Sequence, residues 1–326
     1  MRKLLKNLNK YTIALSALSA AALTNADILT SVRPLGFIAS SIADGITETQ
    51  VLIPAGASPH DYSMKPSDAK RVRDAEFVLW IGKDIDAFLE KSIAQRDATS
   101  VLTISKLAGI ESLLGETSAH DHDHDHDHDH DHDHDHDHDH DHDHDHDHHH
   151  STNELEQDWH VWFSPKISEQ VAEQLAQQLT QLYPQHQAKI AANLETFKQQ
   201  LTTTNQQITQ QLAEFKDQGF YVFHDAYRYF ENAYGLQQTG YFTINPLIAP
   251  GAKKLAKIKE EINEHKVKCL FAEPQFTPKV LQTLQQSTNV KIGQLDPMGE
   301  KIALGTGSYS AFLQQIAKDF SDCLKN

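Results

Sequence analysis

A tract in which Asp and His alternate, His120–His150, constrains the fold of this chain more than any other feature. It contains no apolar residue, so it cannot contribute to a hydrophobic core, and we expect a disordered loop over 116–153. Its imidazoles and carboxylates are ligands for Zn²⁺ and its neighbours in the first transition row. A solvated charge run and a cloning tag are the alternatives, although a tag is usually an uninterrupted run at a terminus. The tract therefore favours a metal-handling protein.

The N-terminal segment, 1–26, has the pattern of a secretory signal peptide. Four basic residues lie among the first ten, an apolar stretch spans Thr12–Leu23, and Thr24–Ala26 offers a cleavage site. The apolar stretch is too short for a stable membrane span, and no later run reaches membrane length. An uncleaved interfacial anchor is the alternative. We expect export to an envelope compartment.

The formal net charge of −16 arises mostly in the tract, which holds 14 of the 45 acidic residues and leaves the remainder near neutrality. Because this remainder has no excess of Lys and Arg residues that would form a basic surface, a nucleic-acid partner is not expected. The chain has two cysteines, Cys269 and Cys323, and neither lies near the leader, which excludes a lipid-modified cysteine there. In an oxidising compartment we expect them to pair. Two buried free thiols remain an alternative, and a zinc site is less favoured because no CxxC spacing exists.

Short apolar runs alternate with helical stretches on both sides of the tract, which is the pattern of parallel βα units. The predicted strands are 28–32, 51–53, 77–81 and 101–104 in the first half, and 220–223, 236–242, 268–271 and 291–295 in the second. Helices are expected to begin near Leu35, Ser67, Asp84, Ala226, Ala252, Pro278 and Ser308, with Ser67 as an N-cap. A further strand-like segment is Trp159–Phe163, and Ser164 with Pro165 should begin the next helix. The sequence predicts an α/β fold of two lobes, each a four-stranded, mainly parallel sheet with flanking helices.

A long helix is expected between the lobes. Gln185–Lys216 contains neither Gly nor Pro after a break at Pro184, and as one helix it would extend about 48 Å. It lacks sustained heptads, so we interpret it as a stiff strut rather than a coiled coil. We expect an N-terminal lobe over 27–183, a linking helix over 184–217 and a C-terminal lobe over 218–326. Ligands of such folds bind at the carboxyl ends of strands, here in the cleft between lobes.

Five of the 22 histidines lie outside the tract. His60, His160 and His224 fall in loops or at strand ends, where side chains can converge on a cleft. His186 and His265 fall in polar helical stretches and are predicted to be solvated. Three imidazoles would suit Zn²⁺ and leave a fourth position open.

Two acidic residues are candidates for that fourth position. Asp296 and Glu273 each end a predicted strand. The turn Pro297–Gly299 could direct the Asp296 carboxylate into the cleft, although this residue could equally cap the turn.

Together these segments resemble a known family, the zinc-binding subunits of bacterial ABC uptake systems. The resemblance extends from about Ile28 to the C-terminus. Its motifs, in order, are Gly56–Tyr62 (GASPHDY), Lys65–Asp68 (KPSD), His160–Pro165 (HVWFSP), Phe223–Tyr227 (FHDAY) and Leu295–Gly299 (LDPMG). It implies a periplasmic solute-binding protein without enzymatic activity, a monomer that binds Zn(II) between two lobes and delivers it to an inner-membrane permease. A His-rich loop in the first lobe is a recurrent feature of the zinc importers.

The resemblance implies that His60, His160 and His224 are the zinc ligands, and that Cys269 and Cys323 form a disulfide. Some zinc members carry Glu immediately before the first ligand, where this chain has Pro59, so water or Asp296 is expected as the fourth ligand.

Three other functions stay open. A manganese or iron type member of the same superfamily is one alternative, although manganese members usually carry Glu where His224 stands. A three-His zinc hydrolase is a second. A periplasmic zinc store without a transporter is a third. The tract is expected to bind further zinc weakly.

Overall fold

The computed structural model describes residues 28–115, 157–243, 250–264, 267–275 and 279–325. The predicted signal peptide, the His/Asp tract and His265 lie outside these ranges. In the described part of the chain, no helix is both long and apolar enough to cross a membrane.

The first half contains a parallel four-stranded sheet. Its strands are β1 (Ile28–Thr30), β2 (Thr49–Val51), β3 (Phe77–Trp80) and β4 (Val101–Thr103), in the order β2-β1-β3-β4. Helices α1 (Arg33–Ile42), α2 (Pro66–Asp74) and the short α3 (Glu90–Ile93) accompany it. Successive side chains of β3 point to opposite faces, and each face joins a different apolar cluster. The strand is buried on both faces, which explains its uninterrupted apolar sequence.

The second half repeats this topology. Strands β5 (Phe220–His224), β6 (Gly240–Thr243), β7 (Cys269–Ala272) and β8 (Lys291–Gln294) form a parallel sheet in the order β6-β5-β7-β8. Its helices are α6 (Arg228–Tyr234), α7 (Ala252–Glu264), α8 (Lys279–Thr288) and α9 (Ser308–Leu324). In each sheet the strand order switches direction between the two central strands, β1 and β3 in the first sheet and β5 and β7 in the second. Ligands of α/β folds bind outside the carboxyl ends of the strands at this switch point. The predicted fold class is confirmed.

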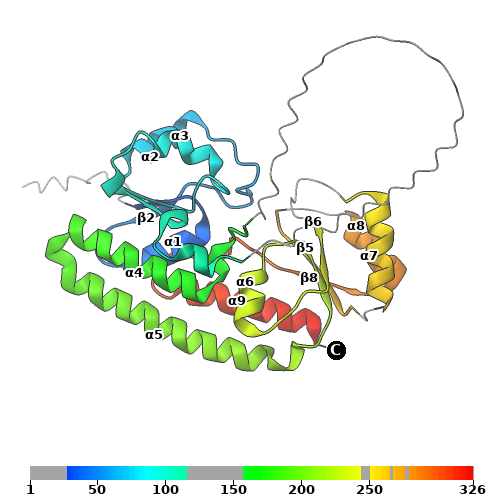
Figure 1. Ribbon diagram of the computed structural model, residues 1–326. Coiled ribbons are helices and arrows are strands. Elements are labelled where there is room, and N and C mark those ends of the chain that lie inside the picture. Colours follow the sequence, from blue (N-terminus) through cyan, green and yellow to red (C-terminus); the bar gives the residue numbers. More distant parts are fainter. Residues whose placement is uncertain (1–27, 116–156, 244–249, 265–266, 276–278, 326) are drawn as a thin grey trace, which may run out of the picture.

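Two long helices follow one another between the two sheets, and the second connects the halves. α4 (Pro165–Leu182) begins as predicted, with the Ser164 side chain accepting a hydrogen bond from the Ile167 N–H and Pro165 at the first helical position. α5 (Gln187–Leu212) follows a short 3₁₀ turn at Pro184–His186 and runs along both halves of the molecule (Figure 1). At about 1.5 Å per residue, its 26 residues span about 39 Å.

The C-terminal helix α9 also joins the halves. It packs against α1 and α5, and the rings of Phe37 and Phe312 lie 5.6 Å apart. Cys323 near its end forms a disulfide with Cys269 of β7, with the Cα atoms 6.0 Å apart. The expected pairing is therefore present. The chain crosses between the halves at α5 and again at α9, and the lobe boundaries given above remain a prediction.

Several local predictions were wrong. Val161–Phe163 form a 3₁₀ turn instead of a strand, and these side chains are apolar because they are buried between the two halves. The helix expected near Asp84 begins later, at Ala87–Leu89, because the buried Asp86 carboxylate accepts the Ile81 N–H and holds a turn there.

One helix end also differs from the prediction. Lys65, not Ser67, precedes the first turn of α2, and the Asp68 carboxylate accepts its N–H over 2.9 Å. The long helix predicted over 185–216 is confirmed as a continuous helical stretch over 184–215, in which α5 has a 3₁₀ turn at each end, Pro184–His186 and Ala213–Phe215. Other 3₁₀ turns are Ala98–Ser100, Ile104–Lys106 and Ile110–Leu113.

Candidate metal centre

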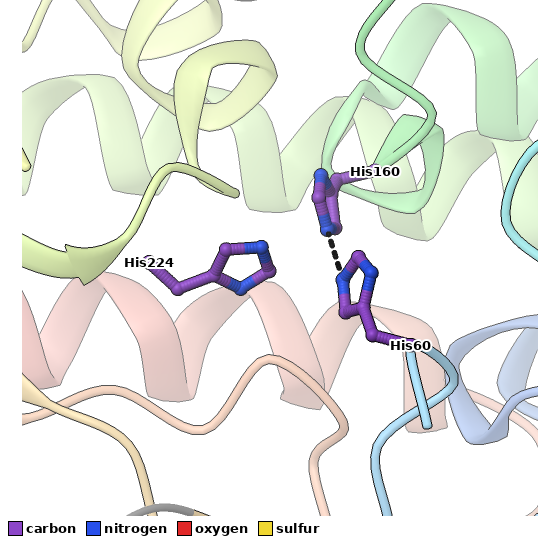
Figure 2. Close-up of side chains that lie close together, drawn as sticks. All are labelled: His60, His160 and His224. Atoms are coloured by element: carbon purple, nitrogen blue, oxygen red, sulfur yellow. Dashed lines mark hydrogen bonds between the residues drawn. The ribbon is translucent and has the colours of Figure 1, made fainter. Parts of the chain in front are cut away.

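Three histidines that are far apart in the sequence lie together between the two halves (Figure 2). His60 is on the loop between β2 and α2, His160 immediately precedes the Val161–Phe163 turn, and His224 is the last residue of β5. β5 borders the switch point of the second sheet, so its carboxyl end faces the crevice where ligands are expected. His160 and His224 are buried, and His60 is partly buried.

The ring nitrogens of these residues are close enough to share one ion. One ligand atom from each residue lies within 4.8 Å of the others. Among the described residues, these three histidines form a group that could hold a metal ion. His60 Nε2 and His160 Nε2 are 3.3 Å apart. Two nitrogens bound to one tetrahedral Zn²⁺ at roughly 2.0 to 2.1 Å would be separated by about 3.3 Å. The geometry of this pair therefore fits a shared zinc ion.

Asp158 orients the His160 ring. Its Oδ1 accepts hydrogen bonds from His160 Nδ1 over 2.7 Å and from the His160 backbone N–H over 2.9 Å. Because the Nδ1 proton is used in this bond, Nε2 is left with a free lone pair that faces His60. A carboxylate behind a metal-binding imidazole fixes the tautomer and raises the basicity of the ligand nitrogen.

Glu273 lies behind His224 in a similar way. Its Oε1 is 3.7 Å from His224 Nδ1 and accepts a hydrogen bond from the Tyr227 hydroxyl over 3.2 Å. His224 Nε2 is buried and has no hydrogen-bond partner in the described part of the chain. Buried polar atoms in proteins are normally satisfied, so this nitrogen fits a site that a cation completes. The carboxylates of Asp158 and Glu273 also bring two negative charges close to the three imidazoles.

The electrostatics keep His60 neutral. Burial is the largest cause and charge repulsion from the neighbouring His160 and His224 rings the smaller one, and together they lower its pKa from 6.5 to about 2. Zn²⁺ binds the neutral imidazole, so the site presents this ligand in the required form at neutral pH.

The space between the rings is small. The pocket lined by the three histidines has a volume of about 20 Å³, and Trp162, Pro297 and Met298 cover it with apolar surface. The Trp162 indole N–H donates to the Pro297 carbonyl over 3.1 Å, and this hydrogen bond joins the two halves of the molecule beside the pocket. About 10 to 15 Å³ holds one water, whereas pockets for organic ligands are usually several hundred Å³. The cavity has room for an ion.

The family model for the periplasmic component A of zinc-uptake complexes, ZnuA, matches residues 28–323. The chain belongs to this family.

Curated members of the family are similar over nearly their full length. The high-affinity zinc uptake system protein ZnuA of Haemophilus influenzae is 56% identical over 338 residues, covering 99% of both chains. The ZnuA protein of Yersinia pestis is 44% identical over 303 residues, covering 93% of this chain and 92% of its own.

Solved structures share the fold. A crystal structure of ZnuA matches with a TM-score of 0.71 at 22% identity, over 92% of this chain and 99% of the other. A zinc-bound ZnuA that lacks residues 138–173 matches with a TM-score of 0.69 at 21% identity, over 92% and 98%. At these identities the likeness concerns the fold alone.

Asp296 is placed differently from the three histidines. Its carboxylate accepts the backbone N–H groups of Met298 and Glu300 over 3.0 and 2.7 Å, and the Gln275 side chain over 3.3 Å. Among the described residues, the group of potential ligands does not include it. In this structure Asp296 fixes the turn after β8.

Sequence reasoning found the three histidines but missed Asp158. The available signal was an acidic residue two positions before a candidate ligand, in the sequence Asp158-Trp159-His160. The sequence predicts Glu273 as a fourth ligand, or as the general base of the hydrolase alternative, whereas the structure places its carboxylate beside Nδ1 of the His224 ring.

Proposed function

We propose that this chain captures Zn²⁺ in the periplasm and delivers it to the membrane permease of an ABC importer. The observation that supports this most is the convergence of three imidazoles, from both halves of the molecule, on a cavity with room for an ion. Membership of the zinc-uptake family supports the same function. The proposed ligands are Nε2 of His60, His160 and His224.

The ligand chemistry favours zinc over manganese. Imidazole suits Zn²⁺, whereas carboxylate and water suit Mn²⁺. The two nearby carboxylates, Asp158 and Glu273, lie on the Nδ1 side of His160 and His224 and not among the converging nitrogens. We propose water in the fourth position, with Asp296 as the competing candidate if its turn rearranges.

The same cavity argues against a hydrolase. A catalytic zinc site needs an open position for water and space for the substrate beside it. The pocket of about 20 Å³ under Trp162, Pro297 and Met298 has no room for an organic substrate in this conformation. Hydrolysis of an activated ester that a chelator abolishes would contradict this proposal.

Substitution of the ligands tests the site. His60→Ala, His160→Ala and His224→Ala are each expected to lower zinc affinity by orders of magnitude, measured by titration against a competing chelator. His186→Ala is the matched control, because His186 lies in a 3₁₀ turn before α5, away from the cluster. Unchanged affinity in the three variants would refute the ligand assignment.

Delivery distinguishes an importer component from a zinc store. A strain without this protein should regain growth in zinc-depleted medium when it receives the wild-type gene, but not when it receives the His224→Ala gene. If the wild-type gene fully restored the growth of a strain that also lacks the permease, the protein would act as a zinc store instead.

N-terminal sequencing of the exported protein tests the proposed cleavage after Ala26, and light scattering tests the proposed monomer.

The tract is proposed to bind further zinc weakly. It lies outside the described residues, and its composition alone supports this proposal. Deleting Asp121–His149 should reduce the number of zinc ions bound and leave the affinity of the tight site unchanged. Equal stoichiometry before and after deletion would show that the tract does not bind metal.

A further inference from the structure

Tyr229 lies at a meeting point of three chain segments. It is a buried residue of α6 in the second half. Its hydroxyl donates to the Asp158 carbonyl over 2.6 Å and accepts the Gly115 N–H over 2.9 Å. The Asp158 N–H in turn donates to the Gly115 carbonyl over 3.0 Å. These three hydrogen bonds form a closed ring.

One side of the ring leads to His160. Asp158 takes part in the ring through its backbone, and its side chain binds both the Nδ1 and the backbone N–H of His160. Any displacement of the Asp158 backbone would therefore turn the imidazole that it holds. Ligand nitrogens must stay within a few tenths of an ångström of their place for a zinc site to keep its geometry.

The other side of the ring leads to His224. Tyr229 follows His224 by five positions, and Ala226 and Tyr227 between them are fully buried. Tyr227 is also bound to Glu273, which lies behind His224. The position of the Tyr229 hydroxyl is thus tied to the end of β5 through a short, packed segment.

We infer that Tyr229 is a positioning residue for zinc binding: its hydroxyl holds Asp158, and through it His160, at the distance from His224 that the ion requires. The inference rests on the proposed function. The same hydroxyl thus contacts both Gly115 and Asp158, two residues that are distant in the sequence, and the ring holds their backbones together.

The test compares two phenylalanine variants of α6. Tyr229→Phe removes the hydroxyl from the ring. Tyr234→Phe removes a hydroxyl from the same helix that donates to Asn205 over 2.6 Å, away from the ligands. Zinc affinity of the full chain is measured with a competing chelator, and the melting temperature of the zinc-free protein is measured in parallel.

Tyr229→Phe is expected to weaken zinc binding roughly tenfold, at the lower end of the range for outer partners of metal ligands, whereas Tyr234→Phe changes it less than about twofold. Both variants should lower the melting temperature to a similar extent. In nitrogen-15 spectra, the His160 ring should lose part of its Nδ1-protonated form in Tyr229→Phe only. Should Tyr229→Phe fail to fold, Gly115→Pro opens the same ring, and Leu114 already has the extended backbone that precedes a proline.

Equal zinc affinity in the wild type and Tyr229→Phe, or an equal loss in Tyr234→Phe, would overturn the inference while leaving the proposed function intact. A wild-type chain whose affinity matches that of His160→Ala would overturn both.

Discussion

The backbone N–H of Gly56 donates to Glu300 Oε1 over 2.7 Å, which joins the loop that carries His60 to the turn after β8. Gln275 donates to the same oxygen over 2.8 Å, and the Glu300 N–H is held by Asp296. The His60 loop is therefore attached to the second half, where His224 lies. We expect Glu300→Ala to release zinc faster, with a loss of affinity of roughly tenfold, comparable to that of other outer partners of metal ligands.

Stopped-flow mixing of the zinc-loaded protein with a chelator measures this rate. Glu300→Gln is the matched control, because it keeps an oxygen that can accept the Gly56 N–H and should stay closer to the wild type. Identical dissociation rates in Glu300→Ala and the wild type would show that this hydrogen bond does not hold the loop.

Asp158→Asn keeps the shape of the side chain but removes its negative charge behind His160. We expect zinc affinity to fall by roughly 10- to 100-fold, because the imidazole becomes a weaker base and its tautomer is less firmly fixed. Competition titration measures the change. Asp322→Asn, on the exposed surface of α9, should bind zinc as the wild type does. An unaffected Asp158→Asn would indicate that packing alone orients the ring.

The stability of the zinc-free protein should depend on pH through His60. Its pKa is lowered to about 2 in the folded state, chiefly by burial, against 6.5 in the unfolded chain. The unfolded chain thus binds more protons between these values, so stability is fully present above pH 6.5 and is lost as the pH falls below it. We expect the free energy of unfolding in urea to decrease by roughly 1 to 2 kcal/mol between pH 7 and pH 5.

His60→Gln should flatten this decrease, and His186→Gln should leave it unchanged. If the wild type and His60→Gln lost stability in parallel, other groups would account for the acid sensitivity.

The disulfide should contribute to stability without affecting the metal site. Cys269 and Cys323 are 54 positions apart, and closing a loop of this length stabilises the fold by roughly 4 kcal/mol in the chain-entropy model. The double variant Cys269→Ser, Cys323→Ser should lose about this amount in urea unfolding. Its zinc affinity should match that of the wild type, because neither cysteine lines the histidine pocket. A large loss of affinity would show that α9 helps to position the site.

Much of the fold could be predicted because the central strands β1, β3, β5 and β7 are buried and have mostly apolar sequences. All eight predicted strands overlap observed strands, except that 51–53 meets β2 only at Val51. The segment Trp159–Phe163 has the same apolar character but is buried by the opposite half of the molecule. Periodicity cannot distinguish these two causes of burial over so few residues.

The candidate site could be predicted only in part. His60, His160 and His224 were recognisable because each lies at a strand end or in a loop, where the topology brings them together. Asp158 and Tyr229 act through hydrogen bonds that depend on the packing of the two halves, and the backbone carbonyl that Tyr229 binds leaves no trace in the sequence. The role of Asp296 could not be predicted for another reason: a carboxylate after a strand suits a metal ligand and a turn cap equally well.

The narrowness of the histidine pocket decides in what form the metal enters. An aqueous zinc ion surrounded by its full shell of water molecules is larger than a cavity of about 20 Å³, and so is a complex of zinc with an organic acid. In this conformation the site therefore holds zinc without its full water shell, so imidazole nitrogens must replace the water ligands one at a time as the ion binds. A complex of zinc with an organic acid would have to dissociate before the ion could bind in this pocket.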